Sequence, residues 1–317
     1  MAYTTINKHT DYFNNKLFTG DGSLPRAITG IGHQPDFVWL KNRSVAYHHQ
    51  LYDSVRGTSA GVLYSSANSA EDSTYQMSSF NTDGYTMGSQ LGAVNGSGEN
   101  IVSWNWKAGT TSGLSGGTIT PSAYSINATS GFGIYKYTGN GTSGATIAHG
   151  LGKVPTSIWV KRLDSAKEWQ IYHTGIGNGK WLEFTNGAKQ TGTSRWNDTS
   201  PTSTLFYLGN DSDVNYNGGT YVAYVFCDVT GYSKIGSYTG TNNAEGPFIY
   251  TGFRPEFVIF KNSDATQHWT MMDTKRDTFN VMDTRLYPSQ NNADATNAAY
   301  YVDYVSNGFK IKTNSAS

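Results

Sequence analysis

The sequence has a single cysteine, Cys227, in 317 residues, so an internal disulfide framework is excluded. Cys227 follows the apolar run at 221–226. A small buried hydrophobic side chain is therefore a better interpretation of this residue than a reactive thiol.

Charge is also scarce, because Asp, Glu, Lys and Arg together make up 15% of the chain. The 23 basic residues equal the 23 acidic residues, so the formal net charge is zero. This balance disfavours an electrostatic function on nucleic acid or on anionic lipid.

Long hydrophobic runs are missing as well, since no apolar stretch approaches the roughly 18 residues of a membrane-spanning helix. The first residues, Met1-Ala2-Tyr3-Thr4-Thr5, lack the basic and apolar regions of a signal peptide. We expect the protein to be made in a cytosol, to stay soluble and not to insert into a membrane.

Aromatic residues, in contrast, reach 14% of the chain, and there are 36 glycines among many serines, threonines and asparagines. Apolar and polar residues alternate with period two, and a helical period is almost absent. This pattern predicts an all-β fold, with antiparallel β-sandwich modules of a jelly-roll or lectin-like type.

The sequence repeats itself three times. Each repeat has a Phe/Tyr-Thr-Gly turn, a proline that opens an apolar run, a lysine that ends this run, and a residue that closes a second apolar stretch, which we call the polar repeat position. These residues are Gly20, Gly139 and Gly240; Pro35, Pro155 and Pro255; Lys41, Lys161 and Lys261; and Asp53, His173 and Asp273. A triplicated unit favours a scaffold or a multivalent binder over a single catalytic pocket.

The repeats divide the chain into five predicted segments. Residues 1–16 form an N-terminal arm in which Tyr12 and Phe13 are the predicted docking residues. The predicted modules are repeat 1 at 17–109, repeat 2 at 135–231 and repeat 3 at 232–317, with a Gly/Ser/Thr linker at 110–134.

The third repeat ends before a closing strand. Residues 101–106 and 221–226 are equivalent period-two strands, since Val102 and Val222 occupy the same place relative to the proline of their repeat. Repeat 3 has no counterpart within this sequence. A sandwich without this strand exposes backbone groups, so we expect that the chain is truncated or incompletely traced, or that a neighbouring chain supplies the strand.

No catalytic residue, metal site or cofactor is predicted. His48 and His49 are adjacent, and adjacent residues of a strand face opposite sides. Residues 211–218 resemble a calcium loop, but the glycine is two positions late, and residues 175–180 lack the helix that a phosphate loop requires. Both segments are better interpreted as turns.

Tryptophans in the period-two strands are predicted core residues, namely Trp39, Trp104 and Trp159. Trp169, Trp181 and Trp196 lie outside these strands and are the predicted ligand-binding residues, for example for stacking on a host surface glycan. A carbohydrate-binding lectin module is therefore an alternative function. A polysaccharide depolymerase is less favoured, because Asp211 and Asp213 are too close along the chain to form a glycosidase pair.

Several longer segments carry a family resemblance that extends over the whole sequence. They are residues 1–16, 51–57, 148–155, 236–240, 252–255 and 306–310. In these segments the chain resembles virion proteins of tailed bacteriophages, especially marine phages, that are described as tail fibre or virion structural proteins. The resemblance supplies no catalytic residues.

The resemblance implies a non-enzymatic virion structural protein, either a tail fibre or a capsid-decoration appendage, that acts by multivalent surface or receptor binding. Implied partners are other capsid or tail proteins, further copies of the chain, with a trimer as the form typical of phage fibres, and a host glycan. Assembly in the bacterial cytoplasm and later exposure on the virion are the implied localisation.

Overall fold

The computed structural model describes residues 4–89, 91–296 and 301–313. Strands hold 38% of the chain and helices 2%, in several antiparallel sheets without a closed barrel, which confirms the all-β sandwich class. Within the described ranges, no helix has the length and apolar character needed to cross a membrane.

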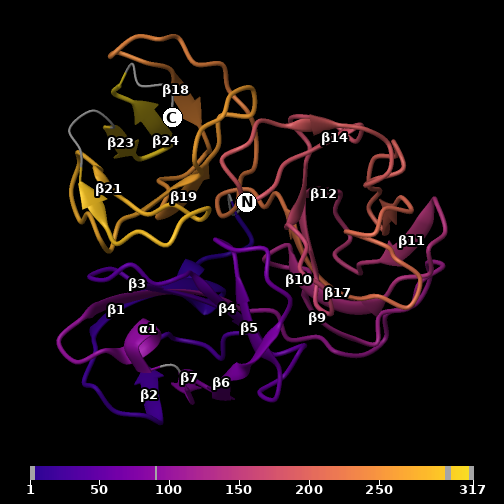
Figure 1. Cartoon of the computed structure of the whole chain (residues 1–317). Helices are drawn as coiled ribbons and strands as arrows, with labels where there is room; N and C mark the ends of the chain where they lie inside the picture. Colours follow the sequence, from indigo (N-terminus) through magenta and orange to yellow (C-terminus); the bar gives the residue numbers. More distant parts are fainter. Residues whose placement is uncertain (1–3, 90, 297–300, 314–317) are drawn as a thin grey trace.

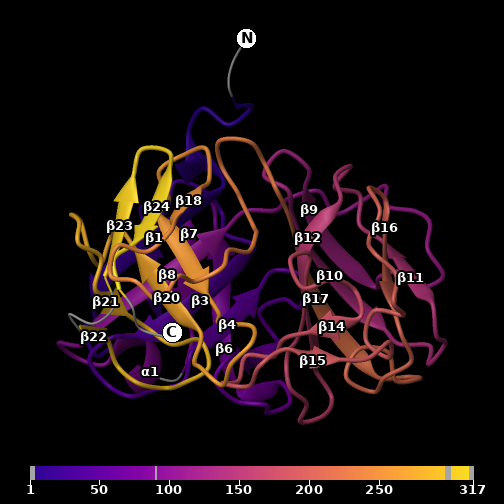
Figure 2. The ribbon, with the colours of Figure 1, turned by 90° about the horizontal axis from the view of Figure 1, so that it is seen from above.

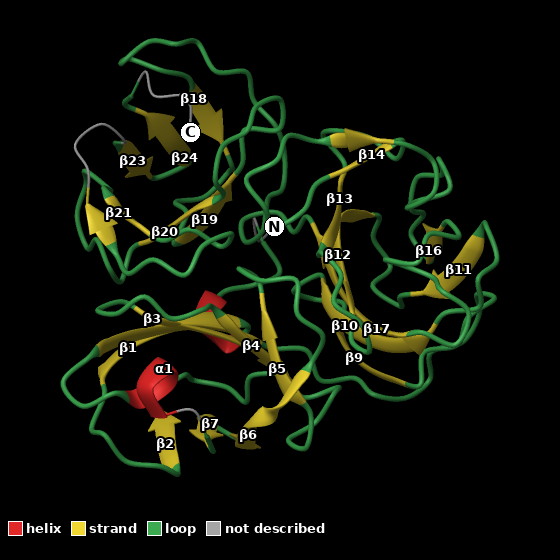
Figure 3. Ribbon diagram, in the orientation of Figure 1, coloured by secondary structure: helices red, strands yellow, loops and turns green. Residues whose placement is uncertain are grey.

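Module 1, as we call residues 13–109, contains one sheet in the strand order β1-β8-β3-β4-β5-β6-β7-β2 (Figures 1 and 3). A short 3-10 helix, η1 (His9–Asp11), precedes it, and α1 (Leu91–Asn95) lies between β7 and β8. The strands are β1 (Phe13–Thr19), β2 (Arg26–Thr29), β3 (Phe37–Asn42), β4 (Gln50–Asp53), β5 (Gly61–Tyr64), β6 (Asp72–Asn81), β7 (Gly84–Met87) and β8 (Asn100–Trp106).

Module 2, residues 110–231, has a five-stranded sheet in the order β13-β12-β17-β10-β9 and the two pairs β11-β16 and β14-β15. Its strands are β9 (Ala123–Asn127), β10 (Phe132–Thr138), β11 (Ala145–Ala148), β12 (Pro155–Arg162), β13 (Gln170–His173), β14 (Lys180–Trp181), β15 (Gln190–Thr191), β16 (Leu205–Leu208) and β17 (Thr220–Cys227).

Module 3, residues 232–313, has the three-stranded sheet β18-β24-β23 and the two pairs β19-β20 and β21-β22. Its strands are β18 (Phe248–Tyr250), β19 (Phe257–Phe260), β20 (Thr270–Asp273), β21 (Thr284–Arg285), β22 (Ala295–Thr296), β23 (Val302–Val305) and β24 (Gly308–Ile311).

The three modules share one pairing scheme. The strand after the repeat proline pairs with the next strand in every module, as β3-β4, β12-β13 and β19-β20. The strand before the proline pairs with a later one, as β2-β7, β11-β16 and β18-β24. Pro35, Pro155 and Pro255 are all buried at equivalent places, which confirms that the sequence repeat is structural.

The strands after the prolines are apolar on both faces because they separate two cores. In β3, Phe37 and Trp39 face a core to which all three modules contribute, while Val38 and Leu40 face the core of module 1. The shared core also contains Trp159, Trp169 and Trp269. A strand that is buried on both faces has a continuous run of apolar residues in its sequence. Trp39, Trp104 and Trp159 are confirmed as core residues.

The modules form a closed ring (Figure 1), in which module 2 lies beside both other modules, also when seen from above (Figure 2). Three equivalent backbone hydrogen bonds join neighbouring modules, each accepted by the carbonyl eight residues after a repeat proline. They are Glu71 N–H to Leu163 O (2.8 Å), Lys189 N–H to Ser263 O (2.7 Å) and Asp294 N–H to Arg43 O (2.9 Å). The contacts run from module 1 to 2, from 2 to 3 and from 3 to 1, so the ring is cyclic and has one polarity.

The closing strand pairs with the strand after the proline in modules 1 and 2, as β8-β3 and β17-β12. It also pairs with the first strand, as β1-β8 and β10-β17. Within residues 301–313 and the rest of the described chain, module 3 has no such strand, and the segment at 232–240 that corresponds to β1 forms no strand.

Two predicted segment boundaries are wrong. The predicted arm at 1–16 extends too far, because β1 begins at Phe13, which packs against Trp106 at 4.8 Å and Phe257 at 5.6 Å between ring centroids. Tyr12 contacts Tyr232 edge-on at 6.2 Å. Both predicted docking residues thus join module 1 to module 3 within the chain.

The predicted linker at 110–134 also contains ordered sheet. It contains β9 and the start of β10, and Thr110 and Ile126 exchange backbone hydrogen bonds of 2.9 Å in both directions. Its Gly/Ser/Thr composition therefore reflects turns next to strands rather than a flexible connection.

Candidate functional site

The three predicted ligand-binding tryptophans are buried, which contradicts their assignment to an exposed surface. Trp169 is 0% exposed, Trp196 is 1% and Trp181 is 6%. Trp169 lies in the joint between modules, where its Nε1 donates to the carbonyl of Tyr64 in module 1 at 2.8 Å. Trp269, at the equivalent position, donates to the carbonyl of Glu183 in module 2 at 2.7 Å.

Trp181 and Trp196 belong to the core of module 2. The Trp196 ring meets Tyr172 edge-on at 5.9 Å, and the Trp181 ring is covered by the guanidinium of Arg195 at 4.6 Å. Neither ring face is available to a sugar. The structure therefore brings none of the three predicted residues to a common surface.

Buried ion pairs occupy the polar repeat position in modules 1 and 3. Asp53 binds Arg56 at 2.5 Å, and Asp273 binds Arg276 at 2.6 Å, with every side chain at most 1% exposed. Burial alone would lower the pKa of the Arg56 guanidinium, but Asp53 raises this pKa above its usual value.

Each of these aspartates also accepts a hydrogen bond from the closing strand of a neighbouring module. Tyr224 of β17 donates to Asp53 at 2.7 Å, and Trp104 of β8 donates to Asp273 at 3.2 Å. Tyr224 and Trp104 are equivalent positions, because they lie opposite Trp159 and Trp39 in the same register. The charged pairs are therefore components of the module joints. Their burial is explained by these contacts and does not require a catalytic role.

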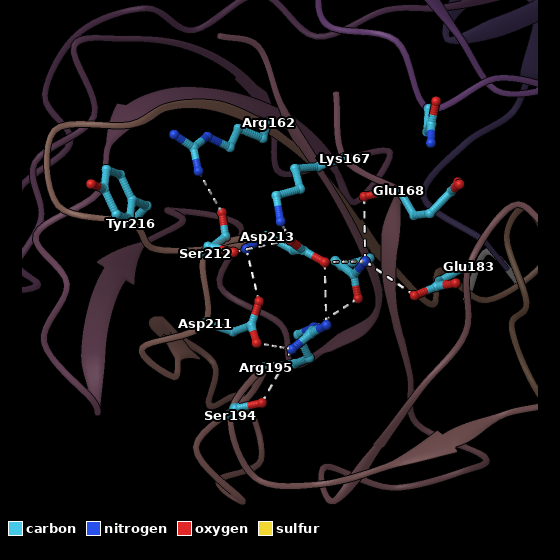
Figure 4. A network of polar contacts seen from close by, with 12 residues as sticks. Arg162, Lys167, Glu168, Glu183, Ser194, Arg195, Asp211, Ser212, Asp213 and Tyr216 are labelled. Atoms are coloured by element: carbon cyan, nitrogen blue, oxygen red, sulfur yellow. Dashed lines mark hydrogen bonds and ion pairs between the residues drawn. The ribbon is translucent and has the colours of Figure 1, made fainter. Parts of the chain in front are cut away.

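A second cluster of charged and polar side chains, which we call the polar cluster, lies in module 2 (Figure 4). It is partly open to solvent, since the Lys167 side chain is 35% exposed and that of Asp211 is 25% exposed. At its centre, Arg195 binds Asp211, Asp213 at 3.2 Å and the side-chain oxygen of Gln170 at 2.9 Å. Lys167 binds the other oxygen of Asp213 at 3.1 Å. The cluster ties three separate segments of module 2 together, at 167–170, 195 and 211–213.

Carboxylates and cations alternate across this polar cluster. Burial and the nearby carboxylate of Glu183 raise the pKa of Glu168, whereas burial lowers the pKa of Lys161 to about 8. Asp211 and Asp213 share one guanidinium, so neither is placed as a free acid or base across a gap that could hold a substrate.

At the edge of the polar cluster, Tyr216 is 54% exposed. Arg162 lies over its ring at 4.7 Å and donates to the carbonyl of Ser212 at 3.2 Å, which fixes the guanidinium (Figure 4). Arg162 also binds Asp164 at 2.7 Å. An exposed aromatic ring beside fixed polar groups is suited to contact with a sugar or another polar surface.

The segment that resembles a calcium loop forms turns, since the carbonyl of Asp211 accepts from the amides of Val214 and Asn215 at 3.1 and 2.8 Å. In the described part of the chain, no group of three or more His, Cys, Asp or Glu side chains is placed to hold a metal ion.

Sequence reasoning missed Arg162, Arg195 and Tyr216. Arg195 precedes a buried tryptophan in a segment without strand period, and its partners lie on other segments of module 2. The sequence does carry one signal for Tyr216, which is an aromatic residue within a polar Asn/Gly turn. A residue in such a turn has no neighbouring strand to cover its ring, so exposure of the ring could have been predicted.

A family model described as a domain of unknown function, DUF7483, matches residues 8–317. No curated protein matches the chain. No solved structure matches it either.

Proposed function

We propose that the chain, which belongs to the DUF7483 family over nearly its whole length, is a non-enzymatic structural protein of a bacteriophage virion. In this proposal it is a tail fibre or capsid-decoration appendage that acts by multivalent surface or receptor binding. It is assembled in the bacterial cytoplasm and exposed on the virion.

The ring with its single polarity is the observation that carries the proposal. In a cyclic arrangement, equivalent loops lie at the same end of the molecule. Three weak contacts presented together bind more tightly than one, because the second and third contacts are intramolecular.

The low content of charged residues, 15% of the chain, supports a role outside the cell. Surface ion pairs contribute little stability and are screened by salt, and the molecule depends instead on a shared aromatic core. The resemblance to phage virion proteins supports the same assignment. Other virion proteins and further copies of the chain are the proposed partners.

The proposal is tested by locating the chain on particles of the phage that encodes it. Antibodies raised against residues 1–317 should label purified virions at one structure, a tail fibre or the capsid surface, in electron micrographs. Absence of the chain from purified, infectious particles by mass spectrometry would overturn the proposal.

A glycan-binding role is the second candidate, and it depends on Tyr216 and Arg162 instead of the buried tryptophans. A glycan array should show binding that Tyr216→Ala abolishes. The matched control is Tyr250→Ala in module 3, because Tyr250 is similarly exposed, at 62%. Equal binding by both variants, or no binding to any glycan, would reject this candidate.

A further inference from the structure

One joint of the ring differs from the other two at a single buried position. His49, Trp169 and Trp269 are equivalent, because each lies 14 residues after the proline of its repeat. Trp169 and Trp269 each donate an indole hydrogen bond to a carbonyl of the neighbouring module. The contact between modules 3 and 1, which we call the 3–1 joint, has an imidazole at this position, and only the imidazole can take up a proton near neutral pH.

The His49 side chain is enclosed in the 3–1 joint. It is 0% exposed, and its Nδ1 accepts a hydrogen bond from Nε1 of Trp39 at 2.7 Å. An indole nitrogen is only a donor, so Nδ1 is unprotonated and Nε2 carries the proton. Nε2 forms no hydrogen bond of normal geometry within the described chain, although the backbone carbonyl of Tyr287 in module 3 is close enough to act on the imidazole.

Tyr287 is the expected acceptor for this position of the ring. Tyr64 and Glu183, whose carbonyls accept from Trp169 and Trp269, each follow a leucine that pairs with the second apolar stretch of their module, and Tyr287 follows such a leucine in module 3. The 3–1 joint thus has the same donor and acceptor positions as the other joints, with a weaker contact between them.

The surroundings of His49 oppose a second proton on its ring. Burial, followed by the positive charges of Lys41 and Arg276, holds the pKa of His49 well below its usual value of 6.5, and His48 acts in the same direction. A proton on Nδ1 would also remove the acceptor of the Trp39 indole.

The buried carboxylates of the 3–1 joint already bind arginines. Asp294 of module 3 binds Arg43 of module 1 at 2.5 Å and Arg276 of its own module at 3.0 Å. Asp273 binds the same Arg276 at 2.6 Å. A charged His49 would have to share a carboxylate that an arginine holds, so the closed joint disfavours the imidazolium.

Two other histidines lie at the edge of this joint. The ring of His268 is 6.0 Å from that of Tyr287, and His268 is only half-buried. His9 is 46% exposed at its side chain and binds Glu256 of module 3 at 3.0 Å, a contact that a proton on His9 strengthens. Both can therefore take up a proton while the joint stays closed.

The lysine that ends the first apolar run distinguishes the joints in the same way. Lys161 donates to the carbonyl of Asn68 in module 1 at 3.1 Å, and Lys261 donates to that of Asn186 in module 2 at 3.4 Å. The hydrogen bonds that the structure gives Lys41 go to two carbonyls of its own module. Within the described residues, the 3–1 joint has neither the indole nor the lysine contact of the other two.

From these contacts, we propose that His49 makes the ring sensitive to acid, because uptake of a proton by its imidazole opens the 3–1 joint while the other two joints stay closed. In the open form the His49 ring lies in water and carries the charge without penalty. Below about pH 6.5 the open form binds more protons than the closed form, so each pH unit favours opening by about tenfold until the closed form also titrates. This inference does not depend on the virion assignment.

Three equivalent amides report separately on the three joints. The Asp294 amide belongs to the 3–1 joint, and the amides of Glu71 and Lys189 belong to the other two. Hydrogen exchange of the intact chain is measured at about pH 7, 6 and 5, with each rate divided by the intrinsic rate at that pH. Protection of the Asp294 amide should fall by about tenfold from about pH 6 to about pH 5, while protection of the other two amides stays constant.

Substitutions at His49 test whether this residue is the titrating group. His49→Asn cannot titrate and retains an acceptor for Trp39, so the Asp294 amide should keep its protection at about pH 5. His49→Trp, which copies the other two joints, should give the same result and serves as the second variant if asparagine disrupts the packing. His48→Asn is the matched control, because His48 is the exposed neighbour, and its response to acid should equal that of the unsubstituted chain.

Three results would each overturn the proposal. One is constant protection of the Asp294 amide in the unsubstituted chain down to about pH 5. Another is an equal loss of protection at all three amides, since acid would then unfold the whole molecule. The third is a loss that persists in both His49 variants or that His268→Asn removes instead, because another group would then be the one that titrates.

Discussion

At the scale of the residue, the polar repeat position couples modules to their neighbours. At Asp53 and Asp273 a buried carboxylate binds an arginine of its own module and an aromatic donor of the next. A buried carboxylate that loses its partner costs several kcal/mol of folding free energy. A substitution at Asp53 or Asp273 therefore affects the packing of two modules.

Asp53→Ala should lower the free energy of unfolding by about 3–5 kcal/mol, because Arg56 then loses its closest carboxylate while 1% exposed. Tyr224→Phe removes only one hydrogen bond to the Asp53 carboxylate and should cost less, about 1.5–3 kcal/mol. Urea denaturation of both variants measures the difference, and similar losses for the two would contradict this account.

Lys161 should make stability depend on pH in the alkaline range. Burial lowers its pKa from 10.5 to about 8, so between these values the unfolded chain binds more protons than the folded chain. The free energy of unfolding therefore rises with pH in this window. In Lys161→Met the rise from about pH 8 to about pH 10 should be smaller by about 2 kcal/mol.

Urea denaturation at several pH values checks the Lys161 prediction. Lys153→Met is the matched control, because Lys153 lies in the same module and is exposed. If the free energy of unfolding depends on pH in the same way in Lys161→Met and Lys153→Met, burial does not lower the pKa of Lys161 and the prediction is wrong.

Trp196→Ala should destabilise the protein by about 3–5 kcal/mol, because a fully buried ring is lost from the core of module 2. Tyr216→Ala, at an exposed position in the same module, should change stability by about 0.5 kcal/mol or less. Thermal unfolding of the two variants distinguishes a core tryptophan from a surface one.

At the scale of the element, close backbone approach between paired strands depends on glycine at the start of the later strand. A Cβ at Gly308 would lie 2.1 Å from the carbonyl oxygen of Ile249 in β18, and one at Gly84 would lie 1.9 Å from that of Ile28 in β2. These two glycines occupy equivalent places in modules 3 and 1.

Gly308→Ala should therefore cost about 1–3 kcal/mol, since β18 and β24 must separate to admit the methyl group. Gly236→Ala in the same module is the control, because a Cβ there would have no neighbour within 4 Å. Chemical denaturation gives both values, and an unaffected Gly308→Ala variant would show that the strands move apart at no cost.

Strands and their equivalence could be predicted from the sequence, because period-two alternation and the repeat prolines are local signals. Phe37, Val38, Trp39 and Leu40 form an uninterrupted apolar run after Pro35, and a short run of this kind predicts a buried strand. The sites of Trp169 and Trp181 could not be predicted, since their burial depends on Tyr64 and Arg195, which are distant along the chain.

At the scale of the whole molecule, ring closure was the least predictable property. Each joint includes one backbone hydrogen bond from Glu71, Lys189 or Asp294, and backbone donors carry no side-chain signature. The sequence indicates three modules in series, and only the contact between modules 3 and 1 distinguishes a ring from an open string.

Small-angle scattering should distinguish these two shapes. A compact ring of 317 residues has an expected radius of gyration of about 20 Å, and an open string of three modules would be clearly larger. The measurement is made at several protein concentrations so that association does not enlarge the value.

The single polarity of the ring has a consequence for its persistence. Every joint uses the carbonyl eight residues after a repeat proline as acceptor, so three separate copies of such a unit would close a ring of the same kind. Joined in one polypeptide, the units meet at a fixed effective concentration, and the ring persists at dilutions that would dissociate a trimer of free subunits.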